Sequence, residues 1–120
     1  MATYSKEKLS ASTQGKAIKV VATSSPGTTI HATGVSSTVE DEIWLYAYNS
    51  ASSSSTLTIQ FGGTTSPDND IKLSIPATSG LTLITPGLIL TGTGSDANTV
   101  YAYATNTNVI TISGYVNRIT

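Results

Sequence analysis

Residues 41–63 read DEIWLYAYNSASSSSTLTIQFGG, and this stretch decides the fold class of the chain. Before the serine run, aliphatic and aromatic residues alternate. The aliphatic positions are Ile43, Leu45 and Ala47, and the aromatic positions are Trp44, Tyr46 and Tyr48. After the serine run, Leu57, Ile59 and Phe61 alternate with polar residues. A period of two residues is that of a β-strand, so the stretch predicts two strands joined by a polar connection.

The serine run itself, residues 50–55, has two interpretations. Serine-rich tracts are typical of flexible linkers between domains. Two matched strands so close on either side indicate instead a hairpin or a corner between strands of one domain. The length of 120 residues favours the second interpretation, because two domains of half that size would each be hard to stabilise.

Further strand patterns follow one another along the chain, separated by Gly, Pro, Asn and Asp. We expect strands at 17–22, 28–32, 41–48, 56–61, 71–75, 81–84 with 88–90, 100–104 and 109–116. Pro86-Gly87 interrupts the sixth of these. No convincing helix appears. About eight short strands predict an all-β fold, a single β-sandwich that is jelly-roll-like.

The first fifteen residues show neither helical nor strand periodicity. We interpret residues 1–15 as an extended N-terminal arm and residues 16–120 as the β-sandwich domain. Two alternatives are open for the arm: a frayed terminus, or a segment that docks on a partner.

Composition restricts the function classes. Charged residues make up 11% of the chain, the net charge is −1 and there are no cysteines. The chain therefore has no basic patch for nucleic acid and no disulfide or thiolate chemistry. No apolar run is long enough to span a membrane, and the N-terminus does not resemble a secretory signal. We expect a soluble protein made in a cytoplasm.

Three groups of residues are candidates for a chemical site. His31 is the only histidine, and no nucleophile motif accompanies it, so a structural role is expected. Residues 68–70, Asp-Asn-Asp, carry the oxygen ligands of calcium but match ordinary turn residues better. Residues 40–42, Glu-Asp-Glu, would be split between two faces by alternation, and we interpret them as a charged strand edge that discourages aggregation. No catalytic set, cofactor or metal is predicted.

The aromatic residues are the most informative feature. Trp44, Tyr46 and Tyr48 lie opposite an aliphatic face, and Tyr101 and Tyr103 alternate with small aliphatic residues in the same way. The outer face of a sandwich is normally polar, so exposed aromatic residues indicate a surface that something covers. Three alternatives are open: an aromatic core, an oligomer interface and a platform for a ligand.

A small, cysteine-free β-sandwich rich in Ser, Thr, Ala and Gly resembles the head decoration (cement) proteins of tailed bacteriophages. The segments that carry this resemblance are DEIWLYAYNSASSSSTLTIQFGG and TVYAYATNTNVITISGYVNRI, within residues 40–119. The resemblance implies a structural virion protein on the capsid surface, where it binds the major capsid protein and stabilises the head, often as a homotrimer. It also implies that the arm contacts the capsid, with Thr3, Tyr4, Lys6, Lys8 and Leu9 as candidates. The five aromatic residues would then form the oligomer interface.

Two other function classes compete with this one. Exposed aromatic residues on a β-sandwich can stack on sugar rings, which fits a carbohydrate-binding or receptor-binding domain of a phage fibre. An enzyme is the third alternative, and His31 and the acidic residues are the only candidate catalytic residues for it.

Overall fold

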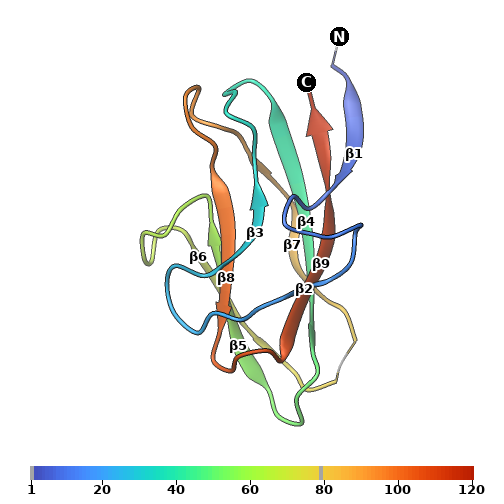
Figure 1. The fold of residues 1–120 in the computed structure, drawn as a ribbon, viewed down its shortest axis with the longest axis vertical. Coiled ribbons are helices and arrows are strands. Elements are labelled where there is room, and N and C mark those ends of the chain that lie inside the picture. The colour runs from blue at the N-terminus through green and yellow to red at the C-terminus, as the bar shows by residue number, and fades with distance from the viewer. Residues whose placement is uncertain (1, 79) are drawn as a thin grey trace.

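A computed structural model describes residues 2–78 and 80–120, and within them the chain is all-β (Figure 1). The described residues contain no helix long and apolar enough to cross a membrane. The strands are β1 (Tyr4–Lys8), β2 (Ile18–Lys19), β3 (Thr28–Ala32), β4 (Glu40–Asn49), β5 (Ser55–Phe61), β6 (Asp70–Ile75), β7 (Thr82–Leu90), β8 (Thr99–Ala104) and β9 (Ile110–Ile119).

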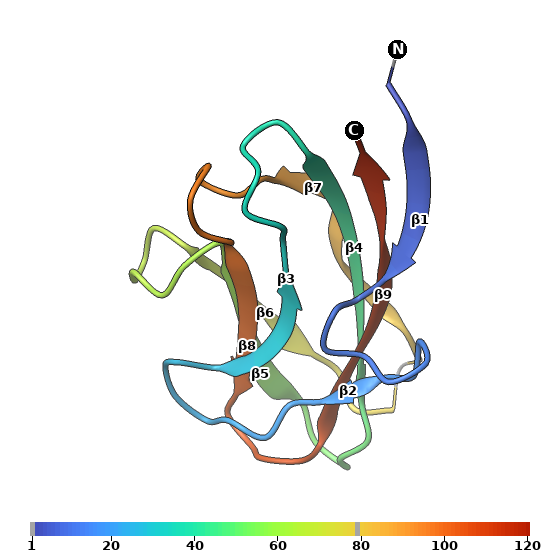
Figure 2. The same cartoon turned by 45° about the horizontal axis from the view of Figure 1, so that its top comes forward.

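The strands form two antiparallel sheets that pack face to face (Figure 2). Sheet A has the order β1-β9-β4-β7, with β2 also paired to β9, and sheet B has the order β3-β8-β5-β6. Successive strands from β2 to β9 change sheet at every connection except that between β5 and β6. This is the connectivity of a jelly roll. The predicted β-sandwich and its jelly-roll-like topology are therefore confirmed.

The N-terminal segment differs from the prediction. It is extended, but residues 4–8 pair along β9 as strand β1, and Leu9 is only 1% exposed. Because β1 and β2 both pair with β9, they are two pieces of one edge strand, interrupted by residues 9–17. The predicted boundary between residues 15 and 16 therefore cuts through one sheet. Leu9 is the only large aliphatic residue among residues 2–15, so the segment has no periodicity that a sequence pattern could detect.

The core lies between the sheets and is aliphatic, as the alternation in β4 predicts. Ile43, Leu45 and Ala47 are fully buried, and Val100, Ala102 and Ala104 are buried on the facing strand β8. Ten consecutive pairs between β4 and β9 fix the register of sheet A, so a slip by one residue would turn this buried set to solvent. The alternative of an aromatic core is wrong.

The serine run is a corner between the two sheets, since β4 belongs to sheet A and β5 to sheet B. The buried side chain of Asn49 holds it in place. Its Nδ2 donates hydrogen bonds to the carbonyl oxygens of Ser53 at 2.9 Å and Ile75 at 3.0 Å, while its Oδ1 accepts one from the backbone N–H of Ala51 at 2.9 Å. A domain linker would not be tied to the core in this way.

Candidate functional site: the outer face of sheet A

The two central strands of sheet A, β4 and β9, present ten side chains outwards, and none of them is buried. On β4 the outward positions are Glu40, Glu42, Trp44, Tyr46 and Tyr48. On β9 they are Thr111, Ser113, Tyr115, Asn117 and Ile119. Directly opposite residues on paired strands share a face, so these side chains form one continuous surface.

An ordered row of side chains crosses this surface. The rings of Trp44 and Tyr115, which lie opposite each other on β4 and β9, are stacked with centroids 6.1 Å apart and planes 10° apart. The ammonium group of Lys6 lies 5.1 Å from the centroid of Tyr115. On the other flank of β4, a Cβ at Gly87 would come within 3.0 Å of the indole of Trp44. Trp44 is therefore held between Tyr115 and Gly87.

Glu42 fixes the indole from a third direction. Its Oε1 accepts hydrogen bonds from Trp44 Nε1 at 3.0 Å and from Asn117 Nδ2 at 2.9 Å. The hydrogen bond from Asn117, followed by that from Trp44, lowers the pKa of Glu42 below its ordinary value. The carboxylate therefore remains an acceptor at neutral pH, and each side chain of the row has at least one defined contact within it.

Of the predicted arm residues, the structure brings Tyr4, Lys6 and Lys8 onto the same face as the aromatic residues of β4. Tyr4, Lys6 and Lys8 are opposite the outward positions of β9, and Tyr4 is 71% exposed. Thr3 continues the strand by backbone pairing with Thr120. Leu9 is the exception, because its side chain is in the core and is not available to a capsid. Sequence patterns miss Tyr115, since only the pairing of β4 with β9 places it beside Trp44.

Tyr101 and Tyr103 lie on the opposite side of the molecule, on the outer face of sheet B. One flat contact thus cannot cover all five predicted interface residues. Part of the outer face of sheet B is covered by the turn at Ser25 and Gly27. Gln60 on β5 accepts a hydrogen bond from the backbone N–H of Gly27 at 2.9 Å and donates one to Ser25 Oγ at 2.8 Å, and it is 1% exposed.

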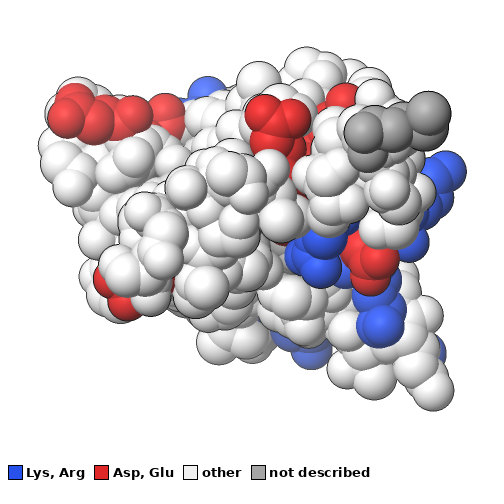
Figure 3. All heavy atoms as spheres, turned by 90° about the horizontal axis from the view of Figure 1, so that it is seen from above, with Lys and Arg blue, Asp and Glu red and all other residues white. Residues whose placement is uncertain are grey.

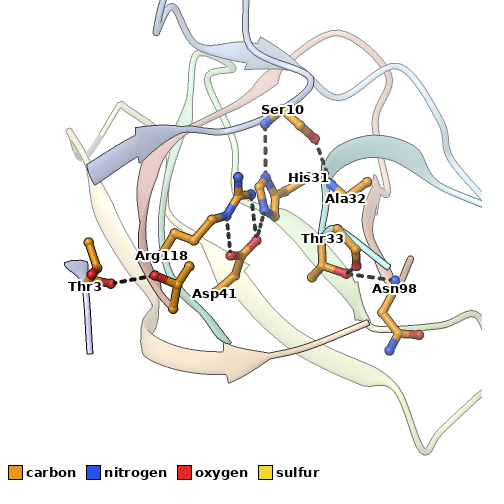
Figure 4. Close-up of polar contacts among 10 residues, drawn as sticks. Thr3, Ser10, His31, Ala32, Thr33, Asp41, Asn98 and Arg118 are labelled. Atoms are coloured by element: carbon orange, nitrogen blue, oxygen red, sulfur yellow. Dashed lines mark hydrogen bonds and ion pairs between the residues drawn. The ribbon is translucent and has the colours of Figure 1, made fainter. Parts of the chain in front are cut away.

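His31 belongs to a buried polar cluster between the sheets (Figure 4). Its Nδ1 accepts a hydrogen bond from the backbone N–H of Ser10 at 3.0 Å, so the proton of the neutral ring is on Nε2, which donates to Asp41 Oδ2 at 2.8 Å. Arg118 binds the same carboxylate through Nε and Nη2, at 2.9 and 3.1 Å. The cluster joins the N-terminal segment, β3, β4 and β9.

This cluster has a structural role, as expected for His31. Both ring nitrogens are engaged and the residue is 1% exposed, so no substrate can reach the ring. Burial alone would raise the pKa of Asp41, but the hydrogen bonds from Arg118 and His31 outweigh it and lower the pKa below 3.8. The cluster thus contains a carboxylate that is charged at neutral pH and fully paired.

The interpretation of residues 40–42 as a charged strand edge is wrong. Strand β4 has β9 on one side and β7 on the other, so it is central in sheet A. Alternation does split the three carboxylates, as predicted: Glu40 and Glu42 point outwards and Asp41 points into the sandwich. Sequence patterns show the spacing within a strand, but not which strands flank it.

Asp68 and Asn69 lie in the turn between β5 and β6 and Asp70 begins β6, in agreement with the preferred interpretation of turn residues. The side chain Oδ1 of Asn69 accepts a hydrogen bond from the backbone N–H of Thr65 at 3.0 Å, and Ser66 Oγ donates to Asp70 Oδ2 at 2.8 Å. Two of the predicted oxygen ligands are thus engaged in holding the turn itself.

Charge is unevenly distributed over the surface. Four of the six basic residues lie in the first nineteen positions, on or beside the β1–β2 edge of sheet A, and Asp68 and Asp70 lie at the far edge of sheet B. Seen from above, most of the basic groups in view lie on the right with one acidic group among them, and the other acidic groups lie towards the left and the top of a largely uncharged molecule (Figure 3). The basic side coincides with the β1 end of the outer face described above.

Comparison with known protein families, with curated proteins and with solved structures found no match. The fold and the site define the class of the protein: a jelly-roll β-sandwich with an ordered aromatic outer face and a buried His-Asp-Arg cluster.

Proposed function

We propose that the protein is a structural binding protein, a capsid decoration (cement) protein that attaches to the outer capsid surface through the outer face of sheet A. This proposal rests on one observation, that two sets of residues lie side by side on one surface. The basic strand β1, with Lys6 and Lys8, lies beside the row of Tyr115 and Trp44. Tyr and Trp with flanking charge are typical of protein interfaces.

The physical state of this face supports binding to a rigid surface. Stacking, the Lys6 contact and the two hydrogen bonds to Glu42 already fix the side chains, so little conformational entropy is lost on binding. A capsid presents the same site many times, so weak individual contacts suffice when several copies act together. The major capsid protein is the partner that this proposal implies.

The carbohydrate-binding alternative has less support at Trp44. A sugar ring stacks on the face of an aromatic ring, and the indole already has the ring of Tyr115 stacked beside it and Gly87 close to it on the other flank. Glycan binding through the tyrosines of either sheet remains the competing hypothesis, and binding on a broad glycan array that is lost on Tyr101→Ser or Tyr46→Ser would favour it.

The direct test is cosedimentation with heads of the phage whose genome carries the gene. A Tyr46→Ser/Tyr115→Ser variant is expected to bind at least about tenfold more weakly, the effect of losing interface anchors. The matched control is Tyr101→Ser/Tyr103→Ser, which alters the same residue type at similar exposure on sheet B. Absence of binding by the unaltered chain, or equal loss from both variants, would contradict the proposal.

A further inference from the structure

Strand β7, at one edge of sheet A, carries an unusual concentration of exposed apolar side chains. Leu81, just before the strand, is 63% exposed, and Leu83, Leu88 and Ile89 are 47%, 40% and 46% exposed. Of the other large apolar residues that are exposed in the described chain, Val21 and Val35 lie in loops and Tyr4 lies on β1. Isolated exposed apolar residues are normal, but a cluster on one strand indicates a contact surface.

Leu83 and Ile89 are opposite the outward residues Tyr46 and Glu42, whereas Leu88 is opposite the buried Ile43 and faces the other way. Leu81, Leu83 and Ile89 are called the apolar strip below, and the strip itself carries no charge. From residue 73 to residue 95 the sequence contains no Asp, Glu, Lys or Arg. The other sheet edges in the described chain are protected. Strands β1, β2 and β6 each carry charged residues, and β3 is covered by the N-terminal segment, whose Ala11 N–H donates to the carbonyl of Ile30. Charged residues and covering segments are the usual protection of an edge strand.

What protects β7 is its irregular backbone. Its register with β4 shifts twice, and Pro86 and the left-handed Gly87 lie at the middle of the strand. Pro lacks an N–H and a bulge bends the strand, so a second strand cannot pair continuously along this edge. A partner is therefore held by side chains rather than by extension of the sheet.

We propose that two copies of this chain associate through this strip, related by a two-fold axis. In such a contact the strip packs against an identical strip, so it must be compatible with itself. An apolar strip meets this condition when the two-fold axis lies nearer Leu83 than Ile89, because Glu42 is opposite Ile89 on the same face. The basic β1 edge, at the other end of sheet A, stays solvated.

The size of the strip sets the expected strength. Leu81, Leu83 and Ile89 together expose about as much as one and a half fully exposed side chains per copy, and Tyr46, opposite Leu83, extends the strip across the outer face. This is less than stable specific interfaces bury and corresponds to a transient contact. The dimer is therefore expected to be weak, forming at high micromolar concentration and dissociating on dilution.

The test uses the purified full chain alone, so its outcome does not depend on whether a capsid is bound. Sedimentation velocity measures the mass over a concentration series. Two variants are compared with the unaltered chain: Leu83→Glu/Ile89→Glu and Leu83→Lys/Ile89→Lys. Each is expected to remain monomeric at every concentration, because like charges then face one another across the axis. A mixture of the two is expected to form a mixed dimer, because opposite charges then meet whatever the register.

The controls are Val21→Glu and Val35→Glu, which put a charge at positions 55% and 53% exposed, away from the strip, and are expected to dimerise normally. Circular dichroism checks folding, and the milder Leu83→Thr/Ile89→Thr variant replaces any charged variant that does not fold. A monomeric unaltered chain, or association that survives in the variants, overturns the proposal. A trimer, or variants that stay apart when mixed, indicates a head-to-tail contact and overturns the two-fold arrangement.

Discussion

The outer faces of the two sheets differ in how they are covered. On sheet B, the turn at Ser25 and Gly27 folds over β5 and is tied to Gln60, so Gln60 and its neighbour Thr58 are buried although they point away from the core. On sheet A, no outward residue of β4 or β9 is buried. One sheet is partly covered by its own chain, and the other is ordered but open.

This difference separates aromatic residues that look equivalent in sequence. The segments LYAYN and VYAYA have the same alternation, and both place tyrosines outwards. Only the first belongs to a face that also holds Tyr115, Lys6 and the exposed side chains of β7. A pattern within one strand predicts which side chains point outwards, whereas the neighbouring strands decide whether a surface for a partner results.

The largest effect on stability should come from a substitution that weakens the contact between the two sheets. Asp41→Ala removes the buried carboxylate that binds both His31 and Arg118. We expect a loss of about 3 kcal/mol in the free energy of unfolding, because the buried Nε2–H of His31 is left without an acceptor and the paired hydrogen bonds from Arg118 are lost. Urea or guanidinium unfolding measures it. Asp96→Ala, at an exposed loop position, is the matched control and should change stability little.

The pH dependence of the free energy of unfolding tests the pairing of Asp41 with Arg118 and His31. The pKa of Asp41 is lowered in the folded chain, so its contribution to stability is complete above its ordinary value of 3.8 and is lost as the pH falls through the lower folded value. Asp41→Asn lacks this contribution. The stability difference between the unaltered chain and Asp41→Asn should therefore shrink at acidic pH, and a difference that stays constant down to strong acid would contradict the assigned pairing.

A smaller loss of stability is expected from a substitution at Gln60, which holds the turn over the outer face of sheet B. Gln60→Ala deletes both hydrogen bonds to the turn and leaves the Gly27 N–H without its acceptor. We expect a loss of about 1–3 kcal/mol and faster hydrogen exchange at the Gly27 amide. Gln60→Glu keeps an acceptor for Gly27 but buries a carboxylate, so it should lose at least as much stability as Gln60→Ala while exchange at the Gly27 amide is slower than in Gln60→Ala. Unchanged exchange at Gly27 in Gln60→Ala would mean that the turn is held by other contacts.

The sequence predicts the local features of this fold well, because they depend on neighbouring residues. Alternation places Ile43, Leu45 and Ala47 inside and Trp44 outside, and the close spacing of two strands identifies the serine run as part of one domain. These predictions need only the period of a strand and the preference of turns for particular residues.

The remaining features depend on pairing between distant segments. Asp41 and Arg118 are 77 positions apart, and Trp44 meets Tyr115 only because β9 is the strand beside β4. For the same reason, sequence patterns alone assign residues 40–42 to an edge and strand β1 to a free arm. The alternation in β4 does predict that Asp41 points inwards, so a buried carboxylate and the single His31 are the available signal for the cluster.

The smallest effect is expected from Gly87→Ala, which disturbs the outer face of sheet A without replacing a tyrosine. Gly87 has a φ of +80°, and a Cβ there would lie 3.0 Å from Trp44 Cε2 and Cζ2. Gly87→Ala should therefore cost about 1–2 kcal/mol for the left-handed backbone and also displace the indole. Trp44 is the only tryptophan, so its fluorescence emission reports that displacement directly.

Gly15→Ala separates the two effects. Gly15 has a φ of +86°, but a Cβ there would meet no atom within 4 Å, so the variant carries the backbone cost alone. We expect both variants to lose stability and only Gly87→Ala to change the emission of Trp44. If the emission is unchanged in both, the indole is free to move and the open face is not preorganised. If it changes as expected, order on sheet A depends on a close fit across three strands, which a partner can use without first fixing the side chains.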